Sequence, residues 1–325
     1  MLYVKATMAQ ITQPLNTQTH PMKHQYLIAS IIAAPLMAIT STVSHAGDWK
    51  TSFTPSVTSA SYEGATIRQS LSEKGVTLSS VYKEELGLTL GLNNTYINFE
   101  GGSYTDQNSI LLSGNWKYTA LSVPGKWNAR FDIHSIKNND PTGNTDQVKA
   151  WSPQLSWTSN TGTLYLDLGY ARSTYLNDLS VNQVTPTIGF GLNDGYDWVQ
   201  IRGYAISGMN PARAVGKTDT SAVDVKWTHF LKPSRSGLKP SSFSVGLMAG
   251  EKLYAVDMDA QSVANIADVQ TSGINLAGNW SISKATKLML LAGQSGFRNI
   301  NIGQTPNIQS DYKINVLNAT LFVNF

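Results

Sequence analysis

The chain has 325 residues, with 24 Lys and Arg against 21 Asp and Glu, and it contains no cysteine. Charged residues make up 14% of the sequence, against roughly 25% in an average soluble domain. The lack of cysteine excludes thiolate zinc sites, iron–sulfur clusters and cysteine nucleophiles. The nearly balanced charge argues against a nucleic-acid partner, which would need a clustered basic excess. We expect no metal, nucleotide or redox cofactor.

Residues 1–46 have the pattern of a secretory signal. A basic start at residues 22–24 is followed by an apolar run of 13 residues, 26–38, and by small residues before a cut between Ala46 and Gly47. The alternative is a membrane anchor, but an anchor needs about 20 apolar residues. We therefore expect export and cleavage at Ala46, with Met22 as the initiator, and one mature domain at 47–325.

No stretch after residue 47 sustains a helical period. Short runs alternate apolar residues with polar or small ones, and clusters of Gly, Asn, Asp, Pro and Ser separate them, which is the pattern of β-strands. An even number of strands, fourteen, is predicted. They cover residues 51–60, 75–82, 86–99, 108–120, 127–136, 148–159, 163–175, 184–192, 197–208, 221–231, 243–256, 272–282, 287–299 and 311–325.

The predicted connections alternate between short turns and longer loops, as expected when each strand crosses a bilayer and one side meets the exterior. The long loops are 61–74, 100–107, 137–147, 209–220, 257–271 and 300–310, and the segment 232–242 is an exception on the short side. None is long enough to predict a large constriction folded into the barrel. Loops 61–74 and 257–271 could partly cover its mouth.

Tryptophan favours a membrane over a soluble β-sandwich. Seven of the eight tryptophans fall at the short-turn ends of predicted strands, and only Trp151 lies toward the opposite end. Tyrosines gather near the long loops. A bilayer selects aromatic belts at its two interfaces, whereas a sandwich core would hold tryptophan in the middle of its strands.

The last strand is apolar at every second position and ends in an aromatic residue. Its pattern is carried by Leu317, Ala319, Leu321, Val323 and Phe325. With the signal segment, this strand resembles the bacterial outer-membrane β-barrel family. The resemblance implies an all-β, antiparallel up-and-down barrel with both termini in the periplasm. It also implies residence among outer-membrane lipid and lipopolysaccharide, and a terminal strand that is read by the barrel-assembly machinery.

Fourteen strands enclose more room than the eight that side chains fill and less than the 16–18 of wide channels. No residues remain for a plug or a periplasmic domain, so the sequence favours a porin-like channel for passive diffusion of small polar solutes. The candidate pore-lining residues are Lys117, Arg130, Asp132, His134, Asp167, Arg202, Asp224, Lys226 and Lys252. Their slight basic excess suggests a mild preference for anions or acidic sugars. Alternatively, these charges only hydrate the lumen and pair across strands.

Tyrosines offer a further but weak signal. Tyr165, Tyr204 and Tyr254 have lumen parity and could stack on sugar rings, although tyrosine also fills strands routinely. His229, beside Phe230 at a short-turn end, is interpreted as structural.

Two other functions remain open. Asp132 and His134 lie two residues apart on one predicted strand, with Asp257 and Asp259 beyond another strand on the same side. This set resembles the arrangement of the omptin proteases, in which a histidine oriented by aspartate activates water. The order along the chain is reversed, however, and those enzymes have ten strands. The last alternative is a non-conducting structural or adhesive barrel with a filled lumen.

Overall fold

The computed structural model describes residues 48–119, 123–140, 145–176, 178–214, 216–232, 239–265, 268–300 and 309–325. The expected signal segment and its cut at Ala46 and Gly47 lie outside the described residues, so both stay predictions. The part described here belongs to the unit Ala46–Phe325. Among the described residues, no helix is long and apolar enough to cross a bilayer.

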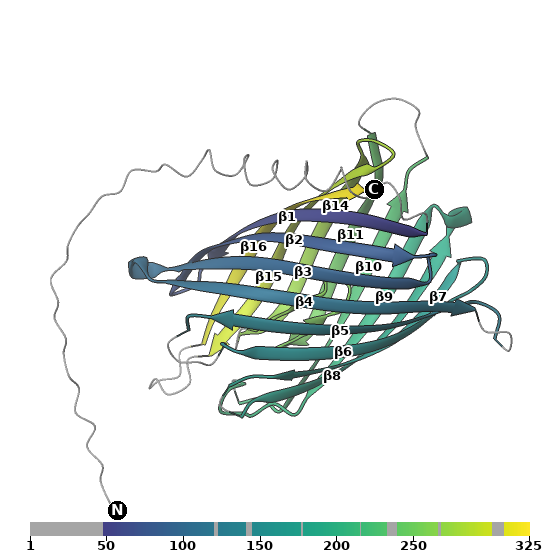
Figure 1. Cartoon of the computed structure of the whole chain (residues 1–325). Helices are drawn as coiled ribbons and strands as arrows, with labels where there is room; N and C mark the ends of the chain where they lie inside the picture. Colours follow the sequence, from purple (N-terminus) through teal and green to yellow (C-terminus); the bar gives the residue numbers. More distant parts are fainter. Residues whose placement is uncertain are drawn as a thin grey trace, which may run out of the picture. The chain divides into compact units, whose positions relative to one another are not determined.

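Fourteen antiparallel strands of this unit form a closed barrel (Figure 1). The predicted fold class and strand number are confirmed. The barrel strands are β1 (Trp49–Glu63), β2 (Arg68–Tyr82), β3 (Leu86–Phe99), β4 (Tyr104–Thr119), β5 (Lys126–Asn138), β6 (Val148–Thr158), β7 (Leu164–Thr174), β8 (Ser180–Leu192), β9 (Asp197–Ser207), β10 (Asp219–Phe230), β11 (Lys239–Lys252), β14 (Val269–Ser281), β15 (Thr286–Ile300) and β16 (Gln309–Asn324).

Each consecutive pair is joined in register, and β1 closes the ring by pairing with β16. Ser52 of β1 pairs with Asn324 of β16, so the barrel's first strand begins where its last strand ends. Closure leaves no unpaired sheet edge, which is the requirement for a sheet in hydrocarbon. The side of the membrane that this end faces stays a prediction.

The wall is apolar outside and polar inside, the reverse of a soluble protein. Leu112 of β4 pairs with Ile133 of β5, and these side chains are 52% and 45% exposed. The next pair along, Ser113 and Asp132, is buried. Alternate residues of a strand point to opposite faces, so the alternation in the sequence becomes an apolar outer surface and a polar lumen.

Tryptophan follows the predicted ends of the strands, with one difference in orientation. Trp49, Trp127 and Trp280 lie within two residues of strand ends at the short-connection side. Trp198 occupies the same level, but it alternates with the inward-facing Arg202 and its ring covers Gly189 of β8, where a Cβ would overlap it. This tryptophan therefore faces the lumen instead of the lipid.

The connection expected at 61–74 is mostly strand. β1 continues to Glu63, which pairs with Lys313 of β16, and β2 already begins at Arg68. The segment is rich in serine and charge and so has the composition of a loop. Its backbone nevertheless pairs with the long neighbouring strand, and this tertiary pairing overrides local propensity.

Three prolines interrupt the ring of hydrogen bonds, and the first, Pro55, leaves the β1–β16 ladder without pairs from Thr54 to Pro55. The ladder between β6 and β7 has no pairs from Ser152 to Pro153, and the ladder between β8 and β9 has none from Thr185 to Pro186. Proline has no N–H to donate. The second and third gaps lie on either side of the pair β7–β8.

Candidate functional site

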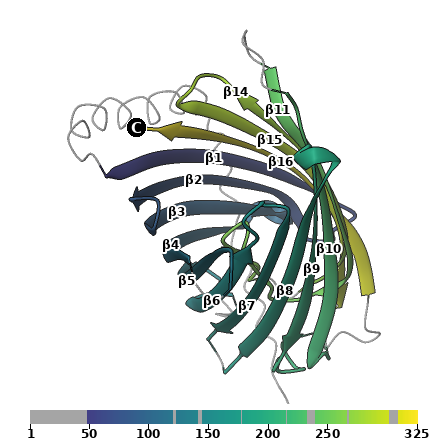
Figure 2. The same ribbon diagram turned by 90° about the vertical axis from the view of Figure 1, so that its right-hand side faces the viewer.

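The connection between β11 and β14, residues 253–268, folds back into the barrel, and we call it the inserted hairpin. It contains two short strands, β12 (Val256–Asp257) and β13 (Ser262–Val263), which pair with each other and not with the barrel. Figure 2 shows the hairpin within the ring of strands. The expectation that no loop is long enough to fold into the barrel as a large constriction is therefore wrong.

The base of the hairpin is held by an apolar cluster. Leu253, Tyr254 and Val269 pack with inward-facing residues of the wall, including Val181 and Ile206, all of them buried. Burying apolar surface stabilises by about 25 cal/mol per Å². This cluster fixes the hairpin to one side of the lumen.

Tyr254 does not belong to a strand, because β11 ends at Lys252. Its ring centroid lies 4.9 Å from that of Tyr175, and its hydroxyl donates a 2.7 Å hydrogen bond to the carbonyl of Arg213. Burial raises the pKa of Tyr254 to about 12. Tyr254 thus anchors the hairpin and is not free to stack on a solute.

The backbone in the middle of the hairpin is hydrogen-bonded to side chains of the wall. The side-chain amide of Gln183 on β8 donates to the carbonyl of Val256 at 2.7 Å, and its oxygen accepts the backbone N–H of Val256 at 2.9 Å. Arg130 of β5 donates to the carbonyl of Met258. The Met258 side chain fills the space over Gly169 of β7, where a Cβ would overlap its sulfur.

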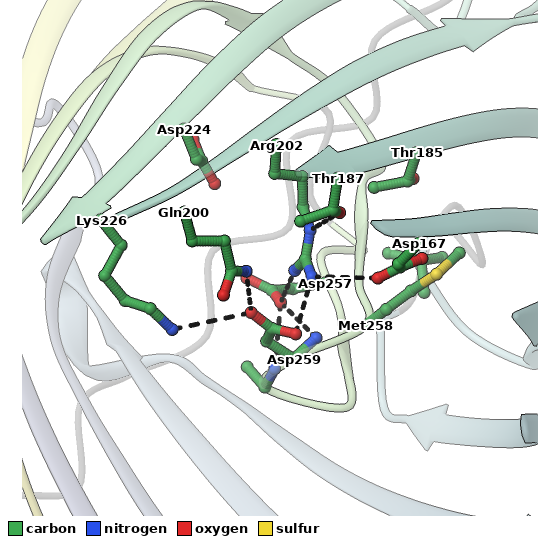
Figure 3. Close-up of polar contacts among 12 residues, drawn as sticks. Asp167, Thr185, Thr187, Gln200, Arg202, Asp224, Lys226, Asp257, Met258 and Asp259 are labelled. Carbon is green, nitrogen blue, oxygen red and sulfur yellow. Dashed lines mark hydrogen bonds and ion pairs between the residues drawn. The ribbon is translucent and has the colours of Figure 1, made fainter. Parts of the chain in front are cut away.

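The tip of the hairpin meets the wall through ion pairs (Figure 3). Arg202 of β9 donates to a carboxylate oxygen of Asp259 at 2.7 Å, and it lies 3.8 Å from Asp257. Gln200 donates to Asp259 at 3.0 Å, and the Lys226 ammonium lies 3.8 Å from it. Burial tends to raise the pKa of the Asp259 carboxyl, but Arg202, Lys226 and Gln200 outweigh it and hold this pKa below its usual range.

Arg202 also contacts side chains of the neighbouring strands β8 and β7. Its Nε donates to Thr187 of β8 at 2.9 Å, and Asp167 of β7 lies 3.7 Å away. Asp167 in turn accepts hydrogen bonds from Gln154 and Tyr165. A buried charge is stable only when paired and hydrogen-bonded, and this guanidinium has both kinds of partner.

Strand register puts eight of the predicted pore-lining residues on the face of the buried Ser113, from Lys117 near the short-connection end of β4 to Lys226 on β10. The ninth, Lys252, follows a register shift at the end of β11 and contacts Asp224 on that face. The structure brings Arg202, Lys226, Asp257 and Asp259 together. Lys252 pairs with Asp224 at 2.6 Å, and its ammonium lies 3.9 Å from the Tyr204 ring centroid. A role in a conducting pore stays a proposal.

Asp132 and His134 lie on β5. Both are buried, and Arg130 Nε lies 3.1 Å from an Asp132 oxygen. Within the described part of the chain, neither Asp132 oxygen makes a hydrogen bond. His229 instead meets Asp197, with Nδ1 2.8 Å from a carboxylate oxygen, and packs on Phe243.

Four residues of the site were not foreseen: Gln183, Thr187, Gln200 and Met258. Gln183, Thr187 and Gln200 occupy inward-facing positions of the strands, but an uncharged polar side chain does not by itself indicate a function. Met258 and the apolar run 253–256 did carry a signal, because apolar residues in a loop indicate burial.

A cavity of about 310 Å³ remains beside the tip of the hairpin. Its charged lining comes from β9, β10 and the hairpin: Arg202, Asp224, Lys226, Asp257 and Asp259. The opposite wall, from β14, β15 and β16, is uncharged and includes Asn275, Gly293, Ser295 and Val316. Among the described residues, no group of three or more His, Cys, Asp and Glu could hold a metal ion.

Solved structures similar to the chain include outer-membrane channels. The monoaromatic hydrocarbon channel CymD matches with a TM-score of 0.52 and 10% identity, covering 86% of this chain and 88% of that one. The toluene transporter TodX of Pseudomonas putida matches with a TM-score of 0.50 and 11% identity, covering 91% and 93%. The chain has the fold of bacterial outer-membrane β-barrel proteins. No protein-family profile and no curated protein sequence matches it.

The terminal strand, whose pattern suggested an outer-membrane barrel, is β16. Leu317, Ala319, Leu321 and Val323 alternate along β16, and Phe325 follows its end, where its backbone N–H donates to the carbonyl of Thr51 on β1 at 2.8 Å. Recognition of this strand by an assembly machinery stays a prediction, as do contacts with lipopolysaccharide.

Proposed function

We propose that this protein is a passive outer-membrane channel for small polar solutes, and that the passage runs beside the inserted hairpin. The observation that carries the proposal is the combination of an apolar outer wall, a polar inner wall and a cavity at the hairpin tip. An enclosed polar space within hydrocarbon is the physical requirement for passage of water-soluble molecules. The structural likeness to known channels supports the fold alone.

The lining favours uncharged solutes over the anions and acidic sugars that the basic excess in the sequence suggested. Arg202 is already paired with hairpin carboxylates, and Lys252 is paired with Asp224. These bases have little charge left to attract an anion. The polar lining also argues against the hydrocarbons named for CymD and TodX.

Single-channel recording in a planar bilayer tests the proposal. Refolded protein is expected to give stable, ohmic current steps. Heat-modifiable mobility on a gel provides the control for a folded barrel. A folded barrel that stays silent, even after removal of the inserted hairpin, would overturn the channel and support a structural barrel with a filled lumen.

The geometry does not favour the protease alternative. Asp257 and Asp259 are engaged by Arg202 on β9, whereas Asp132 and His134 lie on β5, where Asp132 faces Arg130. A peptide-cleavage assay comparing the native protein with His134→Ala tests this alternative directly: cleavage that depends on His134 would restore it.

A further inference from the structure

We propose that the cavity at the hairpin tip is a transit binding site for an uncharged, hydroxyl-rich solute the size of a monosaccharide. The inference rests on the proposed channel function and narrows it to a solute class. The volume of about 310 Å³ lies at the small end of the range for ligand pockets, ~300–1,000 Å³.

One side of the cavity offers both donors and acceptors. Lys226, Asp257 and Asp259 each keep about two-fifths of their side-chain surface exposed. The Lys226 ammonium lies 3.8 Å from Asp259, beyond hydrogen-bond distance, so its N–H groups remain available. A sugar hydroxyl both donates and accepts, and can therefore use the ammonium and the carboxylates together.

The residues on the other side of the cavity are uncharged. They include the apolar or small Gly273, Leu291, Gly293 and Val316 beside Asn275 and Ser295. The C–H faces of a sugar ring are apolar, and close contact with such a wall gains dispersion energy. The cavity thus has one polar side and one weakly polar side, as a sugar ring does.

The charges of the site are paired with one another. Of the three carboxylates that line the cavity, Asp257 and Asp259 contact Arg202, and Asp224 contacts Lys252. An ion that enters the site loses hydration, and the opposite charges that it meets already have partners. A neutral polyol loses less, so the paired charges favour it.

Solute-induced block of single-channel current provides the test. Glucose is expected to block in a saturable way, with an association constant at least about threefold above those of glucuronate and glucosamine, which have the same ring and opposite charges. Stronger block by glucuronate would overturn the inference in favour of acidic sugars, and equal block by all three would show sieving by size alone.

Variants locate the site. Lys226→Gln and Asp257→Asn are expected to lower the association constant for glucose by about three- to tenfold, the loss of one hydrogen bond to a charged group. Glu73→Gln is the matched control, because Glu73 is held by Thr95 on the facing part of the wall at 2.7 Å and does not line the cavity.

The outcomes separate the two proposals. Variants that conduct normally and bind glucose as the native protein does would overturn the site and leave the channel function intact. A folded barrel that carries no current would overturn both.

Discussion

Arg202 on β9 and Asp259 at the hairpin tip are joined by a 2.7 Å hydrogen bond across 57 residues of sequence. The bond joins the wall to a segment that belongs to none of the barrel ladders. The width of the lumen is therefore set by side-chain contacts of the hairpin as well as by the number of strands.

Asp259→Asn is expected to loosen the hairpin tip and increase single-channel conductance and current noise. The variant removes the charge from the shortest contact with Arg202 and weakens docking by roughly 1 kcal/mol, a modest figure because Asp259 is partly exposed. Asp194→Asn, in an exposed turn, serves as the control. Unchanged current in Asp259→Asn would show that the hairpin does not narrow the passage.

Conductance is expected to stay constant from neutral pH down to about 5 and to rise only below about pH 4. The pKa of Asp259 is held below its usual value, which is ~3.9 for an unperturbed aspartate. Its contribution to docking is therefore complete above that value and is lost as the pH falls through the lower pKa of the docked state. Asp259→Asn should remove this step, and a step near neutral pH would assign the effect to another group.

Gly169→Ala is expected to displace the hairpin and lower thermal stability, by roughly 1–2 kcal/mol, because the new methyl group overlaps the Met258 side chain. Met258→Ala in the same chain should restore part of the loss. A double-mutant cycle read by thermal melting measures the coupling. Additive effects of the two substitutions would show that they do not meet.

Replacement of residues 254–267 by a short Gly-Ser turn is expected to leave the barrel folded and increase conductance several-fold. β11 and β14 pair directly with each other over most of their length, so the ring does not need the hairpin. Circular dichroism and gel mobility report the fold, and bilayer recording reports the passage. Loss of the barrel in this variant would show that the hairpin helps to close the ring.

The sequence was sufficient for the strands because a wall between lipid and water imposes a period of two on every strand. Leu112 and Ser113 show this directly, since one faces out and the other is buried. The same rule gave the inward parity of Arg202 and Asp224. For β1, however, this rule predicted an end at residue 60, which is wrong. The strand continues to Glu63 because it pairs there with β16, which is far away in the sequence.

The hairpin could not be derived from periodicity. Its two strands have only two residues each, and its position depends on Gln183 and Arg202, which gave no sign of a partner 57 or more residues away. Trp198 was placed at the correct level, but its orientation depends on the gap that Gly189 leaves. In both cases a tertiary contact determines where the residues lie.

The interrupted ladders at Pro153 and Pro186 border the strands β7 and β8, which carry Asp167, Gly169 and Gln183. The strands β7 and β8 thus form a two-strand panel that holds the hairpin, and the hydrogen-bond ladders of this panel to β6 and to β9 are both incomplete. The amide protons of the panel are expected to exchange with deuterium faster than those of β2 and β3, where the ladders on both sides run unbroken through the middle of the wall. Exchange within this panel would consequently report how firmly the hairpin is seated.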